Sequence, residues 1–363
     1  MPSNVMNSVT KFSATLADLN PKSNSIGFIR LFCALAVIVA HCQPYGGFGT
    51  EILARWSNNQ IGLGRVAVDV FFIISGFLIA MSWSNINNLR RFVWHRFLRI
   101  YPAFWVCLVI TGIILPWYVR GSPSIGYVAK SFACITGVQI DISGVFDDNP
   151  CGGQLNSALW TLPWEIRAYF FLAVLGACGF INTPSHKWVL VLIFLATWIG
   201  FIVQIYSFPG IDTSPAISSG WRLLSFFFIG ALFFEYRHQI HLKWGLFVAS
   251  ITIMIFATIA GMLWLNYSGG LFDSVSQIPL AYAVFYMATR LPLVFNSINT
   301  TTDISYGIYI YGTLVINILV STHFFASYFM LLIAVLFITI PVAYLSWYWI
   351  EAPSLSFKNR LRF

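Results

Sequence analysis

Long apolar runs recur along the whole 363-residue chain, and most of them could cross a bilayer as helices. A spanning helix needs about 20 residues, because each residue adds about 1.5 Å across a hydrocarbon core about 30 Å thick. Blocks such as FFIISGFLIAM and LLIAVLFITI lack the two-residue alternation of membrane barrel strands. The pattern predicts an all-α polytopic membrane protein with about ten transmembrane helices, over residues 26–42, 66–82, 100–119, 158–178, 187–206, 221–236, 245–265, 271–290, 303–322 and 328–349.

The composition supports a single membrane unit. Only 9% of residues are charged and 58% are hydrophobic, whereas a soluble domain carries about 25% charged residues. We expect a mobile cytoplasmic N-terminal tail over 1–25, a transmembrane domain over 26–353 and a cytoplasmic C-terminal tail over 354–363. We do not expect signal-peptide cleavage, because cutting at the ALA triplet near Cys33 would remove Arg30.

The distribution of basic residues predicts the orientation of the chain. With the N-terminus inside, 13 lysines and arginines fall in inner segments and 5 in outer ones, which predicts that both termini are cytoplasmic. The formal charge of +8 is therefore a topological signal dispersed among loops, and we predict no nucleic-acid partner. Membrane lipid is the expected surrounding, and the oligomeric state is left open.

The six cysteines carry no zinc or redox spacing, so we predict no metal site. Three of them, Cys42, Cys134 and Cys151, lie toward the predicted outer side. One disulfide is possible among them, but the sequence does not show which two cysteines would form it.

Two ionisable residues enclose the apolar run of RLFCALAVIVAH, namely Arg30 and His41. At about 100° per residue, eleven steps bring His41 to within roughly 20° of the direction of Arg30 and about 16 Å farther along the helix. One interpretation is an arginine snorkelling inward and a histidine in the outer headgroup region. The other is a functional face, because charges within spans usually face a cavity and mark a substrate or ion pathway.

Two acids fall in the outer halves of inward-running helices. Asp69 is expected at about the depth of His41, and Glu165 lies in LWTLPWEIRAYFF. A carboxylate beside a histidine can set its tautomer and stabilise its protonated form. The competing interpretation of either acid is an interhelical ion pair. Near them, Ser75 and Gly76 are either site residues or small residues that allow close helix packing.

Arg96 and Arg99 supply a complementary charge at the inner side. They lie three residues apart on one helix face in RRFVWHRFLRIYPAFW, and arginine forks bind phosphate bidentately. Topological bias explains Arg90 and Arg91 well, but Arg99 less well, because the membrane boundary begins beside it. Arginines at the inner mouth and a histidine at the outer end suit a polyanionic donor with an outward-reaching tip, such as a coenzyme A thioester.

These residues resemble acyltransferase family 3 membrane proteins, the bacterial enzymes that add acyl groups to cell-surface carbohydrates. The matching features occur in order along the chain: Arg30 with His41, VDVFFIISGFLI (68–79), Arg96 with Arg99, LWTLPWE ending at Glu165, SYGIYIYG (305–312) and WIEAP (349–353). Members of the family often carry a histidine where this chain has Gly312, so we assign no catalytic part to that helix.

The resemblance implies an O-acyltransferase of the bacterial inner membrane that uses acetyl-CoA or another acyl-CoA. His41 would act as general base on an acceptor hydroxyl at the periplasmic side, oriented by Asp69 or Glu165. The donor would be held by a second set of residues, which comprises Arg30, Ser75, Arg96 and Arg99. A covalent acyl-histidine intermediate is the alternative route.

The acceptor is left open by the sequence, which is compatible with O-antigen, capsule, exopolysaccharide, peptidoglycan, a lipid-linked glycan or a small glycan. A transporter or lipid-linked glycan flippase is the second function that ten spans with buried ions would suit. A purely structural membrane scaffold is the third, although it would gain nothing from Arg30 and His41.

Overall fold

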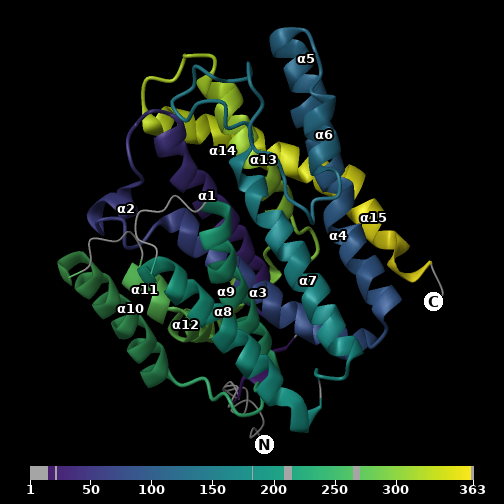
Figure 1. The fold of residues 1–363 in the computed structure, drawn as a ribbon, viewed down its shortest axis with the longest axis vertical. Coiled ribbons are helices and arrows are strands. Elements are labelled where there is room, and N and C mark those ends of the chain that lie inside the picture. The colour runs from purple at the N-terminus through teal and green to yellow at the C-terminus, as the bar shows by residue number, and fades with distance from the viewer. Residues whose placement is uncertain (1–14, 21–22, 182, 208–214, 265–269, 361–363) are drawn as a thin grey trace, which may run out of the picture.

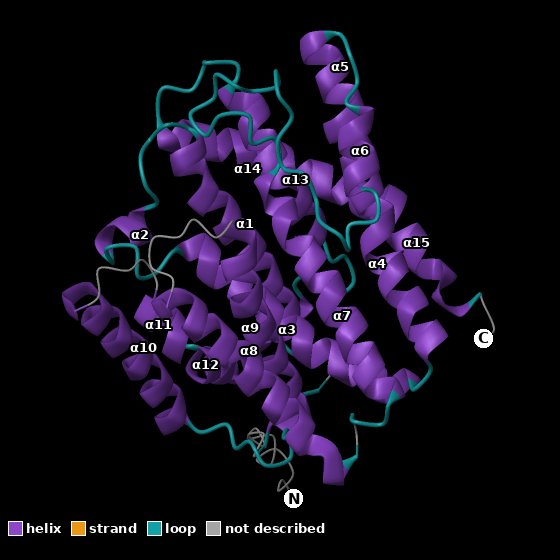
Figure 2. Cartoon of the chain, in the orientation of Figure 1, coloured by secondary structure: helices purple, strands orange, loops and turns teal. Residues whose placement is uncertain are grey.

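A computed structural model describes residues 15–20, 23–181, 183–207, 215–264 and 270–360 of the chain. Figure 2 shows helices joined by loops, with no strand in the described part, so the predicted all-α fold is confirmed. The helices are α1 (Ile26–Tyr45), α2 (Ile52–Trp56), α3 (Leu63–Ile86), α4 (Leu89–Val109), α5 (Leu115–Arg120), α6 (Ile125–Ser131), α7 (Leu162–Ala177), α8 (Lys187–Ser207), α9 (Pro215–Glu235), α10 (Trp244–Trp264), α11 (Gly270–Val275), α12 (Gln277–Arg290), α13 (Ser305–Val320), α14 (Tyr328–Ser346) and α15 (Ala352–Ser356).

Several short 3-10 and π turns extend or connect these helices. The 3-10 turns are η1 (Leu16–Asp18), η3 (Ser157–Thr161), η4 (Pro184–His186), η5 (Leu293–Ser297) and η7 (Phe357–Asn359), and the π turns are η2 (Ile110–Ile114) and η6 (Trp347–Glu351). π turns inside α-helices occur frequently at functional sites. The π turn η6 is of interest for this reason, because it carries a buried glutamate, Glu351.

Helices occupy all ten stretches for which spans are predicted, as far as the structure describes them. Among the described residues, six candidate spans are long and apolar enough to cross a membrane, over 26–45, 63–86, 89–119, 187–206, 244–263 and 328–356. The stretch 271–290 is not one continuous helix, because α11 ends at Val275 and α12 begins at Gln277. A polytopic helical membrane protein therefore fits the structure, while the number of ten crossings stays a prediction.

The helix α3 lies at the centre and packs against α1 and α9. Small residues make the α3–α9 contact close: a Cβ added at Gly76 would lie 1.8 Å from the Phe227 carbonyl oxygen, and one at Gly230 would lie 2.0 Å from that of Ile73. Helix association in membranes relies on such close packing. The packing interpretation of Gly76 is thus correct, and it leaves the neighbouring Ser75 free to face another helix.

In Figure 1, α10, α11 and α12 lie on one side of the molecule and α4, α5, α6 and α15 on the other, while α8 and α9 overlap α3 between them. The helix α1 packs against α13 and α14, and α7 packs against α3, α4 and α9. Residues far apart in sequence therefore meet where α1, α3, α4, α7 and α13 adjoin.

The N-terminal tail predicted over 1–25 lies largely outside the described residues, but its described residues 15–20 contact the rest of the protein. Leu16 is buried, and its backbone N–H donates to the Ile240 carbonyl at 2.8 Å. The N–H of Ala17 donates to the Arg237 carbonyl at 3.0 Å. One buried leucine and two backbone hydrogen bonds hold this segment against the loop after α9.

The chain between α6 and α7 lies beside α4 and α7 instead of forming a simple surface loop. Side chains from both helices donate to its carbonyl oxygens: Tyr101 to Ala133 at 2.8 Å, Trp105 to Phe132 at 3.1 Å, and Arg167 to Ile135 at 2.8 Å. Irregular backbone inside a membrane protein needs such partners, because lipid offers none. Arg167 therefore has a structural role in stabilising this segment.

All six cysteines are free in the structure, so the disulfide that the sequence allows among Cys42, Cys134 and Cys151 is not formed. Cys42 and Cys134 are buried, as is usual for cysteines that behave as small apolar residues.

Candidate active site

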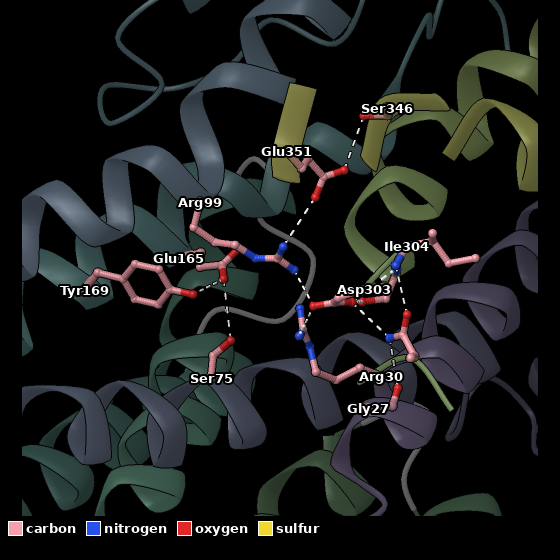
Figure 3. Close-up of polar contacts among 12 residues, drawn as sticks. Gly27, Arg30, Ser75, Arg99, Glu165, Tyr169, Asp303, Ile304, Ser346 and Glu351 are labelled. Atoms are coloured by element: carbon pink, nitrogen blue, oxygen red, sulfur yellow. Dashed lines mark hydrogen bonds and ion pairs between the residues drawn. The ribbon is translucent and has the colours of Figure 1, made fainter. Parts of the chain in front are cut away.

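The centre of the candidate site is an ionic bridge that joins three elements. Arg30 of α1 and Arg99 of α4 both contact Asp303, which precedes α13 (Figure 3). Arg30 Nη1 and Arg99 Nη2 each lie 2.5 Å from Asp303 Oδ2. The other oxygen, Oδ1, accepts from Asn299 Nδ2 at 2.9 Å and Ser305 Oγ at 2.5 Å. Two cations and two neutral donors therefore stabilise the charged form of this acid.

Arg99 has a second acidic partner in Glu351. Arg99 Nη1 lies 3.3 Å from Glu351 Oε2, and Ser346 Oγ donates to Glu351 Oε1 at 3.2 Å (Figure 3). Glu351 is only 2% exposed, because the turn η6 directs it into the protein. Arg99 is therefore held by two carboxylates, and is not the free fork that its position in the sequence suggests.

Arg96 differs from the other two arginines. In the described part of the chain, no carboxylate lies within ion-pair distance of its guanidinium. Arg96 Nη2 donates to Ser82 Oγ at 3.3 Å, and the guanidinium lies 5.7 Å from the Phe92 ring centre. The buried Nε has no hydrogen-bond partner among the described residues. This arginine keeps hydrogen-bonding capacity for an anion.

These side chains face a cavity of about 290 Å³, which we name the inner chamber. Four cations and two carboxylates line it, so its charge is positive. Its ionisable lining consists of Arg30, Arg96, Arg99, Lys358, Glu165 and Asp303, with the hydroxyls of Tyr169 and Tyr306 beside them.

Two further cavities share residues with the inner chamber. A larger one of about 740 Å³, lined also by Asn24, Asn85 and Arg237, shares Arg30 and Asp303 with it. A narrow one of about 50 Å³ shares Arg30, Ser75, Glu165 and Tyr306, and continues between Val68, Phe71 and Tyr309. Arg30 lines all three cavities. It therefore lies where the two wider cavities meet the narrow one, which runs along α3 and α13.

The structure brings Glu165 to the inner chamber and not to His41. Its Oε1 accepts from the Tyr169 hydroxyl and lies 3.5 Å from Ser75 Oγ (Figure 3). Among the described residues no contact supports the interpretation of Glu165 as an orienting partner of His41, because Glu165 projects elsewhere from α7, which begins inside the protein. Its start follows η3, where Thr161 Oγ1 lies 2.7 Å from the hydroxyl of Tyr309, one turn into α13.

His41 lies three turns beyond Arg30 on α1, as its spacing predicts. Its Nδ1 lies 2.8 Å from the Val37 carbonyl oxygen. A carbonyl can only accept, so Nδ1 carries the proton and Nε2 keeps its lone pair in the neutral imidazole. A Cβ added at Gly64 of α3 would lie 3.7 Å from the ring, so this glycine faces the imidazole. The backbone thus sets the tautomer that a general base needs.

Asp69 does not perform that orienting task. Its Oδ1 accepts from Arg222 Nη1 of α9, and Asp69 is fully buried. A second pair lies close by, with Arg65 Nη1 3.4 Å from Asp273 Oδ2. The interpretation of Asp69 as an orienting carboxylate is therefore wrong in this structure, and its alternative, an interhelical ion pair, is correct.

Four charged residues of this region carry no role in the sequence interpretation: Arg222, Asp303, Glu351 and Lys358. Weak signals exist for two of them, because Asp303 stands two residues before SYGIYIYG and Glu351 lies within WIEAP. Arg222 and Lys358 look like ordinary loop or tail charges. Only the arrangement of helices identifies their partners.

The chain is similar in sequence to known proteins over most of its length. A family model described as the acyltransferase domain matches residues 23–348. The "O-acetyl transferase" of Shigella phage Sf6 is 27% identical over 91% of this chain and 95% of its own length. "Nodulation protein 10" of Rhizobium leguminosarum bv. viciae is 26% identical over 93% and 95%. "Acyltransferase MdmB" of Streptomyces mycarofaciens is 34% identical over 25% of this chain and 24% of its own length. No solved structure matches the chain.

Proposed function

The chain belongs to the acyltransferase family 3 membrane proteins and is a membrane O-acyltransferase, and from this premise we propose that it takes an acyl group, most often acetyl, from cytoplasmic acyl-CoA. The acceptor is a hydroxyl of a surface or exported polysaccharide, or of a lipid-linked glycan, at the periplasmic side of the bacterial inner membrane. The excess of lysine and arginine in the predicted inner loops supports this orientation, with both termini cytoplasmic. The transporter alternative loses support, because the matching family model describes an acyltransferase domain.

The single observation that carries the donor assignment is the positive inner chamber. Coenzyme A is a polyanion, and arginine binds phosphate through two parallel hydrogen bonds. Arg96 offers this geometry without a competing carboxylate in the described residues, while Arg30 and Arg99 contribute charge beside Asp303. Ser75 lines both the chamber and the narrow passage, where it can hydrogen-bond the donor.

His41 supports the chemical step. Its Nε2 removes the proton from the acceptor hydroxyl as the oxygen attacks the thioester carbon. The new C–O bond forms, the C–S bond breaks, and the leaving thiolate takes the proton from the imidazolium. The Val37 carbonyl, which binds Nδ1–H, stabilises the imidazolium during this exchange. An acyl-histidine intermediate is the variant in which Nε2 itself attacks the thioester.

Membranes that contain the protein should transfer radiolabel from acetyl-CoA to a glycan fraction in the presence of the producing cell's own polysaccharides. The physical reason is the match between the chamber and a polyanionic donor. The measurement is label in isolated glycan after alkaline release of esters, compared with membranes lacking the protein. Unlabelled glycan together with uptake of intact substrate would favour the transport alternative.

Replacing Arg96 with lysine should weaken binding of coenzyme A by about tenfold, which corresponds to ~1.4 kcal/mol. A bidentate fork becomes a point charge, although the formal charge is kept. Donor affinity is measured on detergent-purified protein. The matched control is Arg91→Lys, an exposed arginine at the start of the same helix that does not line the chamber. Equal affinity of both variants and the unmodified protein would remove Arg96 from the donor site.

A further inference from the structure

The C-terminal segment folds back onto the arginine-bearing helix α4. Trp94 Nε1 donates to the Phe357 carbonyl at 3.4 Å, and His95 Nε2 lies 3.3 Å from the Lys358 carbonyl. The helix α15 and the turn η7 carry the chain from Glu351 to this contact. The sequence interpretation treats 354–363 as a cytoplasmic tail, whereas Lys358 is half-buried and lines the inner chamber beside Arg96 and Arg99.

We propose that Lys358 is a further phosphate ligand of the acyl donor, acting together with Arg96. This inference rests on the proposed function. In the chamber, Arg30 and Arg99 are paired with Asp303, and Arg99 also with Glu351. Arg96 and Lys358 have no carboxylate within ion-pair distance among the described residues. Two uncompensated cations that line one cavity favour an anion between them.

The setting of Lys358 also gives it a distinctive pH dependence. Burial, and then the charges of Arg96 and Arg99, lower the pKa of Lys358 to about 8. The ammonium therefore loses its proton as pH rises through about 8, while the arginines stay charged. The other ionisable groups that face the chamber are Arg30 from α1, Glu165 and Tyr169 from α7, and Asp303 and Tyr306 at the start of α13. His95 of α4 also lies beside Lys358, and burial lowers the pKa of its imidazole, so it stays neutral between pH 7 and pH 9.

Because only the ammonium form binds phosphate well, donor affinity should fall between pH 7 and pH 9. For a group with this pKa, the charged fraction of the free protein falls about tenfold over that interval, which bounds the loss of affinity. A lysine that merely holds the C-terminal segment in place would not produce this dependence.

The test measures binding of the non-transferable thioether analogue of acetyl-CoA to the full-length, detergent-purified protein at pH 7 and pH 9. We expect the unmodified protein to lose up to about tenfold in affinity at pH 9. Lys358→Gln should bind weakly at both pH values, and Lys358→Arg should bind tightly at both, because arginine keeps its charge. Lys243→Gln, at an exposed lysine that does not line the chamber, should follow the unmodified protein.

Repeating the titration with the 3′-dephospho analogue identifies the phosphate. A Lys358 effect that persists assigns the lysine to the diphosphate, and one that vanishes assigns it to the ribose 3′-phosphate. Unchanged affinity of Lys358→Gln at pH 7 would overturn the inference while leaving the donor assignment intact. Failure of the unmodified protein to bind the analogue at all would instead contradict the proposed function.

Discussion

Replacing His41 with alanine is expected to lower acyl transfer by about 10²–10⁴-fold, the usual contribution of a positioned general base. The variant removes the only imidazole on α1, whose Nε2 is left free by the hydrogen bond from Nδ1 to Val37. Transfer is measured as label in isolated glycan per amount of folded protein in the membrane.

Donor binding should separate from chemistry in this variant. Along α1, His41 lies about 16 Å beyond Arg30, so its loss should leave the inner chamber and its affinity for coenzyme A unchanged. His323→Ala is the matched control, because that histidine is exposed in the loop after α13. Normal transfer by the His41→Ala variant would refute the proposed mechanism, and a loss of donor binding would point to a misfolded chamber.

Of the single substitutions proposed for this protein, the one that breaks the Asp69–Arg222 pair should lower its stability most. Asp69→Asn leaves the buried Arg222 without its direct counter-charge, and removing one partner of a buried pair costs about 3–5 kcal/mol. We expect a lower melting temperature in detergent and less protein in the membrane. Asp141→Asn, at an exposed aspartate, serves as the control and should change neither quantity.

A double variant, Asp69→Asn with Arg222→Met, distinguishes a structural from a catalytic aspartate. Removing both charges avoids the uncompensated cation, so much of the lost stability should return. Transfer per folded molecule should return with it, because the structure pairs Asp69 with Arg222 and not with the imidazole. A stable but inactive double variant would restore a catalytic role to Asp69.

The sequence alone was sufficient to predict where the helices lie and which residues share a face of one helix. Apolar runs predict helices over all ten stretches because the need to satisfy backbone hydrogen bonds in lipid is local to each segment. The shared face of Arg30 and His41 follows from the helical period, and the three-residue spacing of Arg96 and Arg99 does so too. The same residues, read in order, resemble the family that the comparison over 23–348 establishes.

The tertiary structure decided which charges meet, because each pairing depends on the depth and rotation of one helix relative to another. Asp69 is at the expected place on α3, yet its partner is Arg222 of α9. Glu165 joins the inner chamber because α7 starts inside the protein, after η3. Asp303 and Lys358 enter the site through a loop and a folded-back C-terminal segment. Hydropathy and helical period are properties of neighbouring residues, whereas these contacts arise from packing between segments distant in sequence.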